Sequence, residues 1–439
     1  MFTGSASVVI SRSESNLAKY RQKSPKVAPG TMRIVFYNHT GIVSGAEKML
    51  LLSLGNLPRN IFDVKLVCPQ EGSLQDSANS LGVPTYTCHP IRARFTYNPF
   101  LFFGYLLSIA RAMIGLRKTL RSLSPDILQA NTVRAGIVAT ISTLGTRIPI
   151  IWHTHDILPS HPLTTLTRLL AHSSKRIRIV ACSRAAAQTL RPFTAKGIPV
   201  TVIHNGIDVA RFRHSPEARA TKREEMGVRK ESFVVGIVGQ VTPRKGQLGL
   251  IRAFTELHSA VPEAILVIVG APLFNKDHDY LGTLEREVSA LQIEKSVRFL
   301  GQRSDVAALM QALDLFVLNS DVEPFALVLI EAMTSGIASI ATDCGGPTEI
   351  IHHGVDGEIV TVGDHHALVR AMTRLATSPS LRAKYGNAAS RNVTQRFSKS
   401  QYVAEWCRLY SEINTSALPL SNVVSIANES LDMQAGIAE

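Results

Sequence analysis

The stretch FVVGIVGQVTPRKGQ, residues 233–247, decides the fold of this 439-residue chain. Its first six residues are mostly β-branched or aromatic and predict a buried strand over Phe233–Val238, after which a helical pattern begins at Gln247. Similar units of a strand and a helix recur along the chain, which predicts parallel sheets with helices on both faces. The expected strands are 33–37, 63–68, 126–130, 148–152, 177–182 and 199–203 in a first series, and 233–238, 265–269, 297–300, 314–319, 337–341 and 358–361 in a second.

Two series of strands predict two doubly wound α/β domains that face each other across a cleft. We expect the first domain at 32–207, the second at 208–398, and a C-terminal helix at 399–414 that packs back toward the first domain. The polar ends, 1–31 and 415–439, are predicted to be disordered, and the first of them is basic. Ligands of such sheets bind beyond the carboxyl ends of the strands, so function is expected in those loops.

The positive charge of the chain is concentrated in its first half. The net charge is +13, and residues 1–200 contain 24 Lys and Arg against 7 Asp and Glu, whereas residues 201–439 contain 23 against 27. Residues 32–200 alone still hold 19 basic against 6 acidic side chains. The first folded domain is therefore basic, which indicates an anionic partner on that side of the molecule.

Composition predicts a globular cytoplasmic protein. Hydrophobic residues make up 45% of the chain and charged residues 18%, far from the values of a disordered chain. The five cysteines are an odd number without a Cys-x-x-Cys pair, so we interpret them as reduced packing residues. No secretory signal is apparent, and the longest apolar run, about 99–110, is too short to span a bilayer.

The loop after the first strand of the second series is suited to phosphate groups. Gly239 ends the strand and Gly246 precedes the helix, so the backbone can turn tightly beside a ligand. Arg244 and Lys245 project two cations from this turn. The alternative is an ordinary connecting loop with a solvated Arg-Lys pair.

A second candidate site follows the apolar strand 314–319. Pro324 is tolerated in a first helical turn, so we place Glu323 at a helix N-terminus and Glu331 about two turns inside. Free amides there favour an anion such as a diphosphate, and the carboxylates can accept hydrogen bonds from sugar or ribose hydroxyls. The alternative is that Glu323 complements the helix dipole and Glu331 is solvated. A lone acid in the apolar run 325–333 should, however, have a partner.

Further loops at strand ends contain glycine or histidine. Gly345 and Gly346 mark a close backbone approach after a strand, and Gly45 follows the first strand without the Gly-x-Gly-x-x-Gly spacing of dinucleotide-binding proteins. His153 and His155 follow the strand 148–152 on one side of the chain, and we favour a single cleft histidine, His153, over a metal site. We interpret the acidic segment 277–279, Asp-His-Asp, as part of a polar loop without a catalytic role.

These segments, in this order, resemble the retaining glycosyltransferases of family 4, whose two Rossmann-like domains form the GT-B architecture. The likeness covers about residues 32–413. Its most specific element is the pair Glu323 and Glu331, set in Ser-Asp-x-Glu-Pro-Phe and Glu-Ala-Met contexts. Supporting elements are Ser44-Gly45-Ala46-Glu47, Asn205-Gly206-Ile207-Asp208, Lys245-Gly246, Val297-Arg298-Phe299-Leu300-Gly301 and Gly345-Gly346-Pro347-Thr348-Glu349.

The resemblance implies a hexosyltransferase that moves a sugar from a nucleotide-diphosphate sugar to a glycan or lipid-linked acceptor, in bacterial cell-surface polysaccharide or glycolipid synthesis. It implies no metal and no cofactor besides this co-substrate, and a front-face substitution with retention. The implied catalytic residues are Glu323, Lys245, Arg244 and His153. The implied donor-binding residues are Glu331, Gly239, Gln240, Phe325, Ala326, Leu327, Arg298, Phe299, Leu300 and Gly45.

Each implied residue has a role in the resemblance. Lys245 and Arg244 would neutralise the diphosphate, with help from the amides of residues 325–327. Glu323 would hold hydroxyls of the donor sugar, and Glu331 those of the ribose. Residues 298–301 would line the base, Gly45 would approach the phosphates, and His153 would contact the sugar near the reacting centre.

Three positions depart from the family pattern. Gln240 stands where an arginine is common, so phosphate neutralisation rests on Arg244 and Lys245. Ala326 replaces the usual glycine after the phenylalanine of the glutamate motif, and Ser44 replaces the first of two paired glycines in the first domain.

The basic half of the chain is the acceptor side in this architecture. The apolar segment 100–107 is bordered by Arg92, Arg94, Arg111, Arg117, Lys118 and Arg121. An apolar helix flanked by cations is typical of a segment that lies on an anionic membrane, so we expect a peripheral enzyme on the cytoplasmic face. The alternative is a helix that only covers the first sheet.

Other functions are also left open. They are a basic nucleic-acid binder, although we expect no nucleic-acid partner, and a hydrolase or epimerase of sugar nucleotides.

Overall fold

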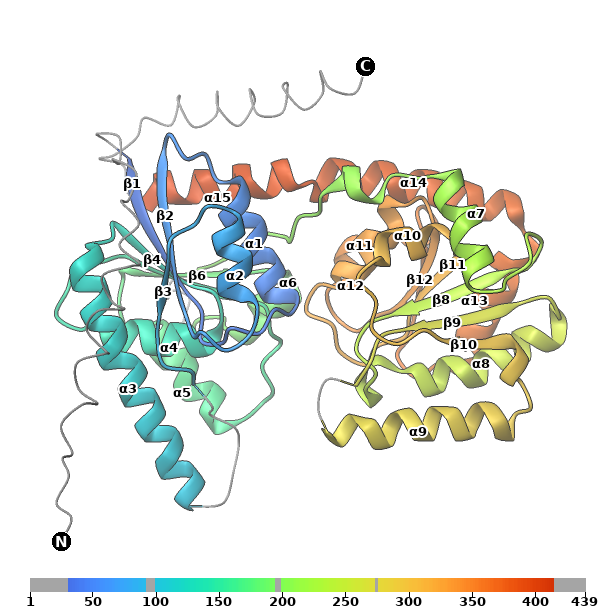
Figure 1. Cartoon of the computed structure of the whole chain (residues 1–439), viewed down its shortest axis with the longest axis horizontal. Coiled ribbons are helices and arrows are strands. Elements are labelled where there is room, and N and C mark those ends of the chain that lie inside the picture. Colours follow the sequence, from blue (N-terminus) through green and yellow to red (C-terminus); the bar gives the residue numbers. More distant parts are fainter. Residues whose placement is uncertain (1–30, 92–98, 194–198, 273–274, 414–439) are drawn as a thin grey trace, which may run out of the picture.

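The computed structural model describes residues 31–91, 99–193, 199–272 and 275–413, which form two α/β domains side by side (Figure 1). The first contains a seven-stranded sheet with the order β3-β2-β1-β4-β5-β6-β7, and the second a six-stranded sheet with the order β10-β9-β8-β11-β12-β13. Neighbouring strands in both sheets are parallel. The predicted fold class is therefore confirmed. The tails predicted at 1–31 and 415–439 lie outside the described residues, apart from Thr31.

The first sheet comprises β1 (Met32–Tyr37), β2 (Phe62–Cys68), β3 (Thr85–Thr87), β4 (Ile127–Ala130), β5 (Ile150–Thr154), β6 (Ile177–Ala181) and β7 (Val200–Val202). Its helices are α1 (Gly45–Asn56), α2 (Leu74–Ser80), α3 (Pro99–Leu123), α4 (Val133–Ser142), α5 (Pro162–Ala171) and α6 (Arg184–Thr189). All six strands predicted for this domain are present. The seventh, β3, was missed because it has only three residues and none of them is fully buried.

The second domain begins with η1 (Val209–Phe212) and α7 (Pro216–Glu225). Its strands are β8 (Val234–Val238), β9 (Ile265–Val269), β10 (Val297–Phe299), β11 (Leu315–Leu318), β12 (Ala338–Thr342) and β13 (Glu358–Val360). The remaining elements are η2 (Pro243–Lys245), α8 (Gln247–Ala260), α9 (Asn275–Ala290), η3 (Glu294–Ser296), α10 (Val306–Gln311), α11 (Leu327–Thr334), α12 (Pro347–Ile350), α13 (His365–Thr377) and α14 (Pro379–Phe397). Each of the six predicted strands is present.

The central strands are buried on both faces, as a parallel sheet between two layers of helices requires. In β8, Val234 and Val238 belong to one hydrophobic cluster, whereas Val235 and Ile237 belong to another on the opposite face. Each such side chain stabilises the fold by about 1.5–3 kcal/mol relative to an exposed one. The five cysteines are all free and buried, and none of the helices in the described ranges is long and apolar enough to cross a membrane.

The chain passes between the two domains twice, and the two connecting segments lie side by side. The backbone amide of Ile207 donates to Phe397 O at 2.8 Å, and the amide of Lys399 donates to Ile207 O at 2.8 Å. Beyond this point α15 (Lys399–Ile413) returns over the first domain (Figure 1). Its aromatic side chains Trp406 and Tyr410 are fully buried in the first core.

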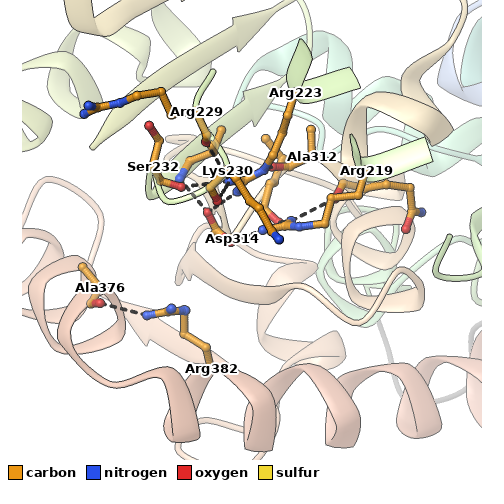
Figure 2. A network of polar contacts seen from close by, with 12 residues as sticks. Arg219, Arg223, Arg229, Lys230, Ser232, Ala312, Asp314, Ala376 and Arg382 are labelled. Atoms are coloured by element: carbon orange, nitrogen blue, oxygen red, sulfur yellow. Dashed lines mark hydrogen bonds and ion pairs between the residues drawn. The ribbon is translucent and has the colours of Figure 1, made fainter. Parts of the chain in front are cut away.

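A half-buried carboxylate, Asp314, holds α7 at the amino edge of the second sheet. Figure 2 shows Asp314, just before β11, between two arginines of α7. Arg219 and Arg223 each approach its carboxylate at 2.5 Å, and the amide of Val234 at the start of β8 donates to it at 2.8 Å. Arg223 also donates to Ala312 O at 3.1 Å and to the carbonyls of Lys230 and Ser232 in the loop between α7 and β8. The side chain of Arg223 is only 5% exposed, so its charge depends on this partner.

We expect Asp314→Asn to lower the free energy of unfolding by about 3 kcal/mol, because it leaves Arg223 buried without its counter-charge. Urea denaturation measures the effect. Glu287→Gln is the matched control, since it breaks a solvent-exposed pair with Arg252 that should contribute less than about 1 kcal/mol. Equal losses in the two variants would contradict the structural role of Asp314.

Candidate functional site between the domains

The carboxyl edges of the two sheets meet at the seam between the domains. A Cβ placed on Gly45, at the start of α1, would lie 3.8 Å from Leu327 Cδ1 of α11 in the second domain. A Cβ placed on Gly345, after β12, would lie 3.4 Å from Ala185 Cβ of α6 in the first domain. The loops in which we expected function therefore come from both domains to one place.

The loop after β8 has a conformation that requires its glycines. Gly239 and Gly246 have φ values of +153° and +67°, and a Cβ on Gly246 would lie 1.8 Å from Asn319 O. Asn319 in turn donates from Nδ2 to Gly246 O at 2.9 Å. The 3-10 turn η2 lies between the two glycines and carries Arg244 and Lys245, so the turn is held against the end of β11 with its cations at the seam.

Lys245 and Glu323 form an ion pair at the centre of this region. Their side chains are only 15% and 8% exposed, and Ser320 Oγ donates to the Glu323 carboxylate at 3.2 Å. The backbone holds Glu323 as well, because its amide donates to Cys344 O at 2.9 Å and Gly346 N donates to its carbonyl at 2.8 Å. Arg244 lies beside the pair and donates to Val322 O at 2.8 Å. Two predicted catalytic residues are thus brought into direct contact.

The predicted position of Glu323 at a helix N-terminus is wrong. The helix α11 begins only at Leu327, and Glu323 instead forms a parallel bridge with Gly345. The reason is Ala326, whose φ of 75° and ψ of 72° interrupt the helical course between Pro324 and the helix. Glu331 consequently lies about one turn inside α11 rather than two. The first amides of the helix have no partner within it.

Glu331 is enclosed at the seam. Burial raises its pKa, whereas the positive charges of Lys48 on α1 and Arg211 in η1 act in the opposite direction. No hydrogen bond to the Glu331 side chain is found within the described ranges. The apolar surroundings of this acid in the sequence predicted a partner but not these two cations, because they lie on other elements and one is in the other domain.

Gln240 is held by a buried acid that the sequence analysis misinterpreted. Its Nε2 donates to Asp277 Oδ2 at 2.8 Å, and its carbonyl accepts from Gln247 Nε2 at 2.8 Å. Asp277 lies in helix α9, not in a polar loop, and is only 2% exposed. The segment 277–279 therefore includes a residue that positions the loop after β8.

His153 is not at the surface of the site. It is 1% exposed, neither ring nitrogen has a hydrogen-bond partner among the described residues, and its ring packs edge-on against Trp406 of α15 at 4.8 Å. His155 lies on the same side of the chain, with ring centroids 3.9 Å apart, but is partly exposed. Burial lowers the pKa of His155 to about 3, so this ring is neutral at physiological pH. His155 is therefore the less buried of the two rings, although its Nε2 is buried and has no hydrogen-bond partner among the described residues.

The first-domain wall contains charged residues that the sequence analysis did not select. Asp156, directly after β5, is exposed, yet its surroundings raise its pKa through desolvation, while Arg134 and, from the other domain, Arg244 oppose this shift. His39, after β1, has its pKa lowered to about 4 by burial and by Arg134, and its Nδ1 is 2.9 Å from Thr132 Oγ1. The sequence contained a signal for His39 and Asp156, since each lies two residues after the end of a strand of the parallel sheet.

Arg298 does not line the site that we predicted for it. Its Nη1 donates to Lys295 O at 2.8 Å and to Val297 O at 3.2 Å, so the guanidinium lies toward the amino end of β10. Phe299 and Leu300 are half-buried and pack against the two cores of the second domain. Gly301, the last residue of the predicted base-lining segment 298–301, lies at the carboxyl edge of the sheet. Its carbonyl accepts a hydrogen bond there from Gly270 N at 2.8 Å.

A cavity of about 620 Å³ lies beside Gly345 at the same seam. Within it the carboxylate of Glu349 accepts hydrogen bonds from the amides of Arg184 and Ala185 at 2.9 and 3.0 Å and lies 3.0 Å from His204 Nε2. Burial opposes ionisation, but these hydrogen bonds hold the pKa of Glu349 below its usual value. None of the predicted catalytic residues lines this cavity, so we assign it to the contact between the domains. No cluster of three or more metal-ligating side chains occurs in the part of the chain that the structure describes.

Comparison with known proteins identifies the class of this enzyme. Residues 43–211 match the model of Glycosyltransferase Family 4, and residues 218–392 match that of Glycosyl transferases group 1. A two-domain α/β enzyme with its charged loops at the seam is the GT-B architecture, and the structure of Anabaena HepE in complex with UDP and glucose has it too. That structure superposes with a TM-score of 0.74 at 27% identity, covering 87% of this chain and 99% of the other.

Curated relatives agree with this class. The Escherichia coli UDP-Gal:alpha-D-GlcNAc-diphosphoundecaprenol alpha-1,3-galactosyltransferase is 23% identical over 82% of this chain and 92% of its own. N-acetyl-alpha-D-glucosaminyl L-malate synthase of Bacillus anthracis is 26% identical over 72% of this chain and 82% of its own. The chain belongs to glycosyltransferase family 4. It is a glycosyltransferase whose donor is a nucleotide sugar.

We expect Ala326→Gly to raise the melting temperature by about 2 °C, because glycine adopts the left-handed conformation without the steric cost of a Cβ. Only part of that cost is recovered, since glycine also increases the entropy of the unfolded chain. Ala332→Gly, in the interior of α11, is the matched control and should lower the melting temperature. Differential scanning fluorimetry distinguishes the two. A decrease for Ala326→Gly as large as that of the control would refute the strain.

Proposed function

We propose that this glycosyltransferase moves a hexose, with retention at the anomeric carbon and without a metal ion, from a nucleoside diphosphate sugar to a lipid-linked glycan at the cytoplasmic face of a membrane. The observation that carries the proposal is the contact of Lys245 with Glu323 at the meeting point of the two carboxyl edges. A cation for the diphosphate and a carboxylate for the sugar are adjacent there, as the anomeric carbon and its leaving group are in the donor.

Lys245 and Arg244 hold the diphosphate in this proposal, together with the first amides of α11 at Leu327. Their positive charge is fixed before the reaction and is worth most when the leaving oxygen gains negative charge. Glu323 accepts hydrogen bonds from hydroxyls of the transferred sugar. Glu331 is half-buried within the fields of two cations, Lys48 and Arg211, and it accepts hydrogen bonds from the ribose. Gly239 and Gly45 permit the close approach of the backbone to the phosphates.

Retention follows from a front-face substitution. The bond between the anomeric carbon and the diphosphate oxygen breaks while the acceptor oxygen bonds to the same face of that carbon. The acceptor proton passes to the departing phosphate, so no carboxylate of the protein is needed as nucleophile. Glu323 is paired with Lys245, which suits a residue that binds hydroxyls rather than one that attacks carbon.

Two residues after β5 are proposed to contact the reacting groups from the acceptor side. His155 replaces His153 in this role, because it is partly exposed whereas His153 is buried. Its neutral ring can accept or donate a hydrogen bond to the transferred sugar without adding charge. Asp156 is exposed and senses the charges of both Arg134 and Arg244, and we assign it to the orientation of the acceptor hydroxyl.

A lipid-linked acceptor is supported by the surface of the first domain. Twelve of the fifteen large hydrophobic side chains that are exposed in the described ranges belong to residues 42–193. On α3, Phe100, Phe103, Leu107 and Ile114 are 51–85% exposed. At 100° per residue they fall within an arc of about 60°, which makes one apolar stripe along the helix. On α5, Leu163 and Leu166 are 50% and 62% exposed. Apolar stripes on a basic domain suit an anionic bilayer surface.

Lys245→Ala and Glu323→Gln should each lower kcat for sugar transfer at least about 100-fold, on the scale known for losing a preorganised charge. Transfer of radiolabelled sugar to a lipid-linked acceptor measures this, with the melting temperature confirming the fold. Arg252→Ala changes an exposed residue of α8 outside the site and should leave kcat unchanged. Activity close to that of the wild type in both site variants would overturn the assignment.

The base of the donor nucleotide can be identified separately. Whichever of UDP, GDP or ADP raises the melting temperature of the protein contains that base.

The paired changes Leu107→Ser and Ile114→Ser should lower binding to phosphatidylglycerol vesicles at least about tenfold, because two apolar side chains no longer enter the bilayer. Vesicle flotation measures the bound fraction. Val355→Ser with Val362→Ser removes exposed apolar side chains from the second domain and should have no effect. Equal binding to neutral and anionic vesicles, or no loss in the α3 variant, would exclude this membrane contact.

A further inference from the structure

A second cavity, of about 350 Å³, lies in the first domain away from the candidate site. It is at the amino edge of the first sheet, where α3 ends and where β1 and β5 begin. Its lining includes Arg33, Arg117 and Arg121, with hydroxyl-bearing residues Ser124, Thr143 and Thr146 between them. Three guanidinium groups around a cavity of this size favour a small anion, and the opposite edge of the sheet is the one that meets the second domain.

The positive charge of this cavity is only partly compensated. Arg33 is paired with Asp126 at 2.9 Å, so its charge is offset. Arg117 uses only Nη1, which donates to the carbonyls of Ser142 and Leu144 at 3.0 and 2.9 Å; carbonyls fix the side chain but do not neutralise it. The Arg121 side chain is exposed and makes no hydrogen bond or ion pair within the described ranges. Two full positive charges therefore remain at the cavity, with guanidinium donors to spare.

The end of α3 has an unusual backbone that directs the chain around the cavity. Ser124 follows the helix with a φ of 44°, one of three positive values among the non-glycine residues of the described ranges. This left-handed residue turns the chain from α3 into β4, so Arg121 of the helix and Arg33 of the neighbouring strand line the same space. Such conformations are costly for residues other than glycine and are often retained at functional sites.

The cavity is continuous with the apolar stripe of α3. Arg121 lies at the same angle around the helix as Phe103 and about 20° from Ile114, and it is about 10 Å along the axis beyond Ile114. Leu144, whose carbonyl holds Arg117, is 57% exposed at the rim. If the stripe lies on a bilayer, the apolar side chains reach the acyl region while Arg121 and the cavity are at the level of the head groups.

We propose that this cavity binds the phosphate group of an anionic membrane lipid through Arg117 and Arg121. The inference rests on the proposed membrane contact of α3 but not on the sugar-transfer chemistry. The phosphate accepts paired hydrogen bonds from the two guanidinium groups, which orient the first domain on the bilayer in addition to the unspecific attraction of its charge. A carboxylate lipid of equal surface charge has only two acceptor oxygens, so it can pair with one guanidinium group but cannot offer paired hydrogen bonds to both.

The test compares Arg121→Ser with Lys118→Ser by flotation. Both changes remove one charge from the exposed side of α3, but only Arg121 lines the cavity. Phosphatidylcholine vesicles contain either phosphatidic acid or oleate, matched in surface potential. Lys118→Ser should weaken binding about fivefold on both vesicles, as expected for one cation near an anionic surface. Arg121→Ser should weaken it about fivefold on oleate and at least about 50-fold on phosphatidic acid, because charge-assisted hydrogen bonds are also lost.

Equal losses for the two variants on phosphatidic acid would overturn the phosphate site and leave the membrane contact intact. Failure of the wild type to bind either vesicle would instead remove the membrane contact itself. A third arm uses inorganic phosphate and the melting temperature. Stabilisation of the wild type but not of Arg121→Ser, without a preference for phosphatidic acid, would make this a site for free phosphate and would overturn the lipid assignment. Because the side chain of Arg121 is exposed and makes no hydrogen bond in the described ranges, Arg121→Ser should fold like the wild type, and the melting temperature checks this.

Discussion

Both sheets of this enzyme are parallel, and the direction of their strands constrains everything else in the molecule. In a parallel sheet all loops at one edge follow strands and all loops at the other edge precede them. Here the two carboxyl edges meet, so a Cβ placed on Gly45 at the start of α1 would lie 3.8 Å from Leu327 of α11, and the Gly345 loop lies against α6. The residues with the most suitable chemistry therefore converge from both domains, although they are far apart in the sequence.

The two edges of each sheet use the same residue types for different purposes. At the amino edge, Asp314 and Asp126 accept hydrogen bonds from both an arginine and the backbone of the neighbouring strand, so their charges are occupied in holding the fold. At the carboxyl edge, Glu331 and Asp156 are surrounded by cations of other elements without a hydrogen bond to their side chains in the described ranges. Asp314 and Asp126 therefore hold the fold, whereas the side chains of Glu331 and Asp156 keep their hydrogen-bonding capacity within the described ranges.

The fold was predictable because its strands are buried on both faces and consist of continuous apolar runs, whose limits differ from the predictions by at most two residues. The site was predictable in part. Lys245 and Glu323 were recognised and are in contact, but Pro324 suggested a first helical turn that the left-handed Ala326 prevents. Alternation placed His153 and His155 on one side of the chain correctly but could not tell which of them is buried, because Trp406 covers His153 from more than 250 residues away.

The sequence by itself determined the class of fold, the order of the catalytic loops and the division of the chain into a basic and a slightly acidic half. Short-range patterns suffice for these properties, since periodicity, glycine spacing and charge are local quantities. Only the tertiary structure decided which cations lie around Glu331, which of His153 and His155 is fully buried, and where Arg298 points. It also showed that Arg33 and Arg121, separated in the sequence by two strands and two helices, line one cavity. Such neighbours depend on how distant elements pack, and no local pattern in the chain records that packing.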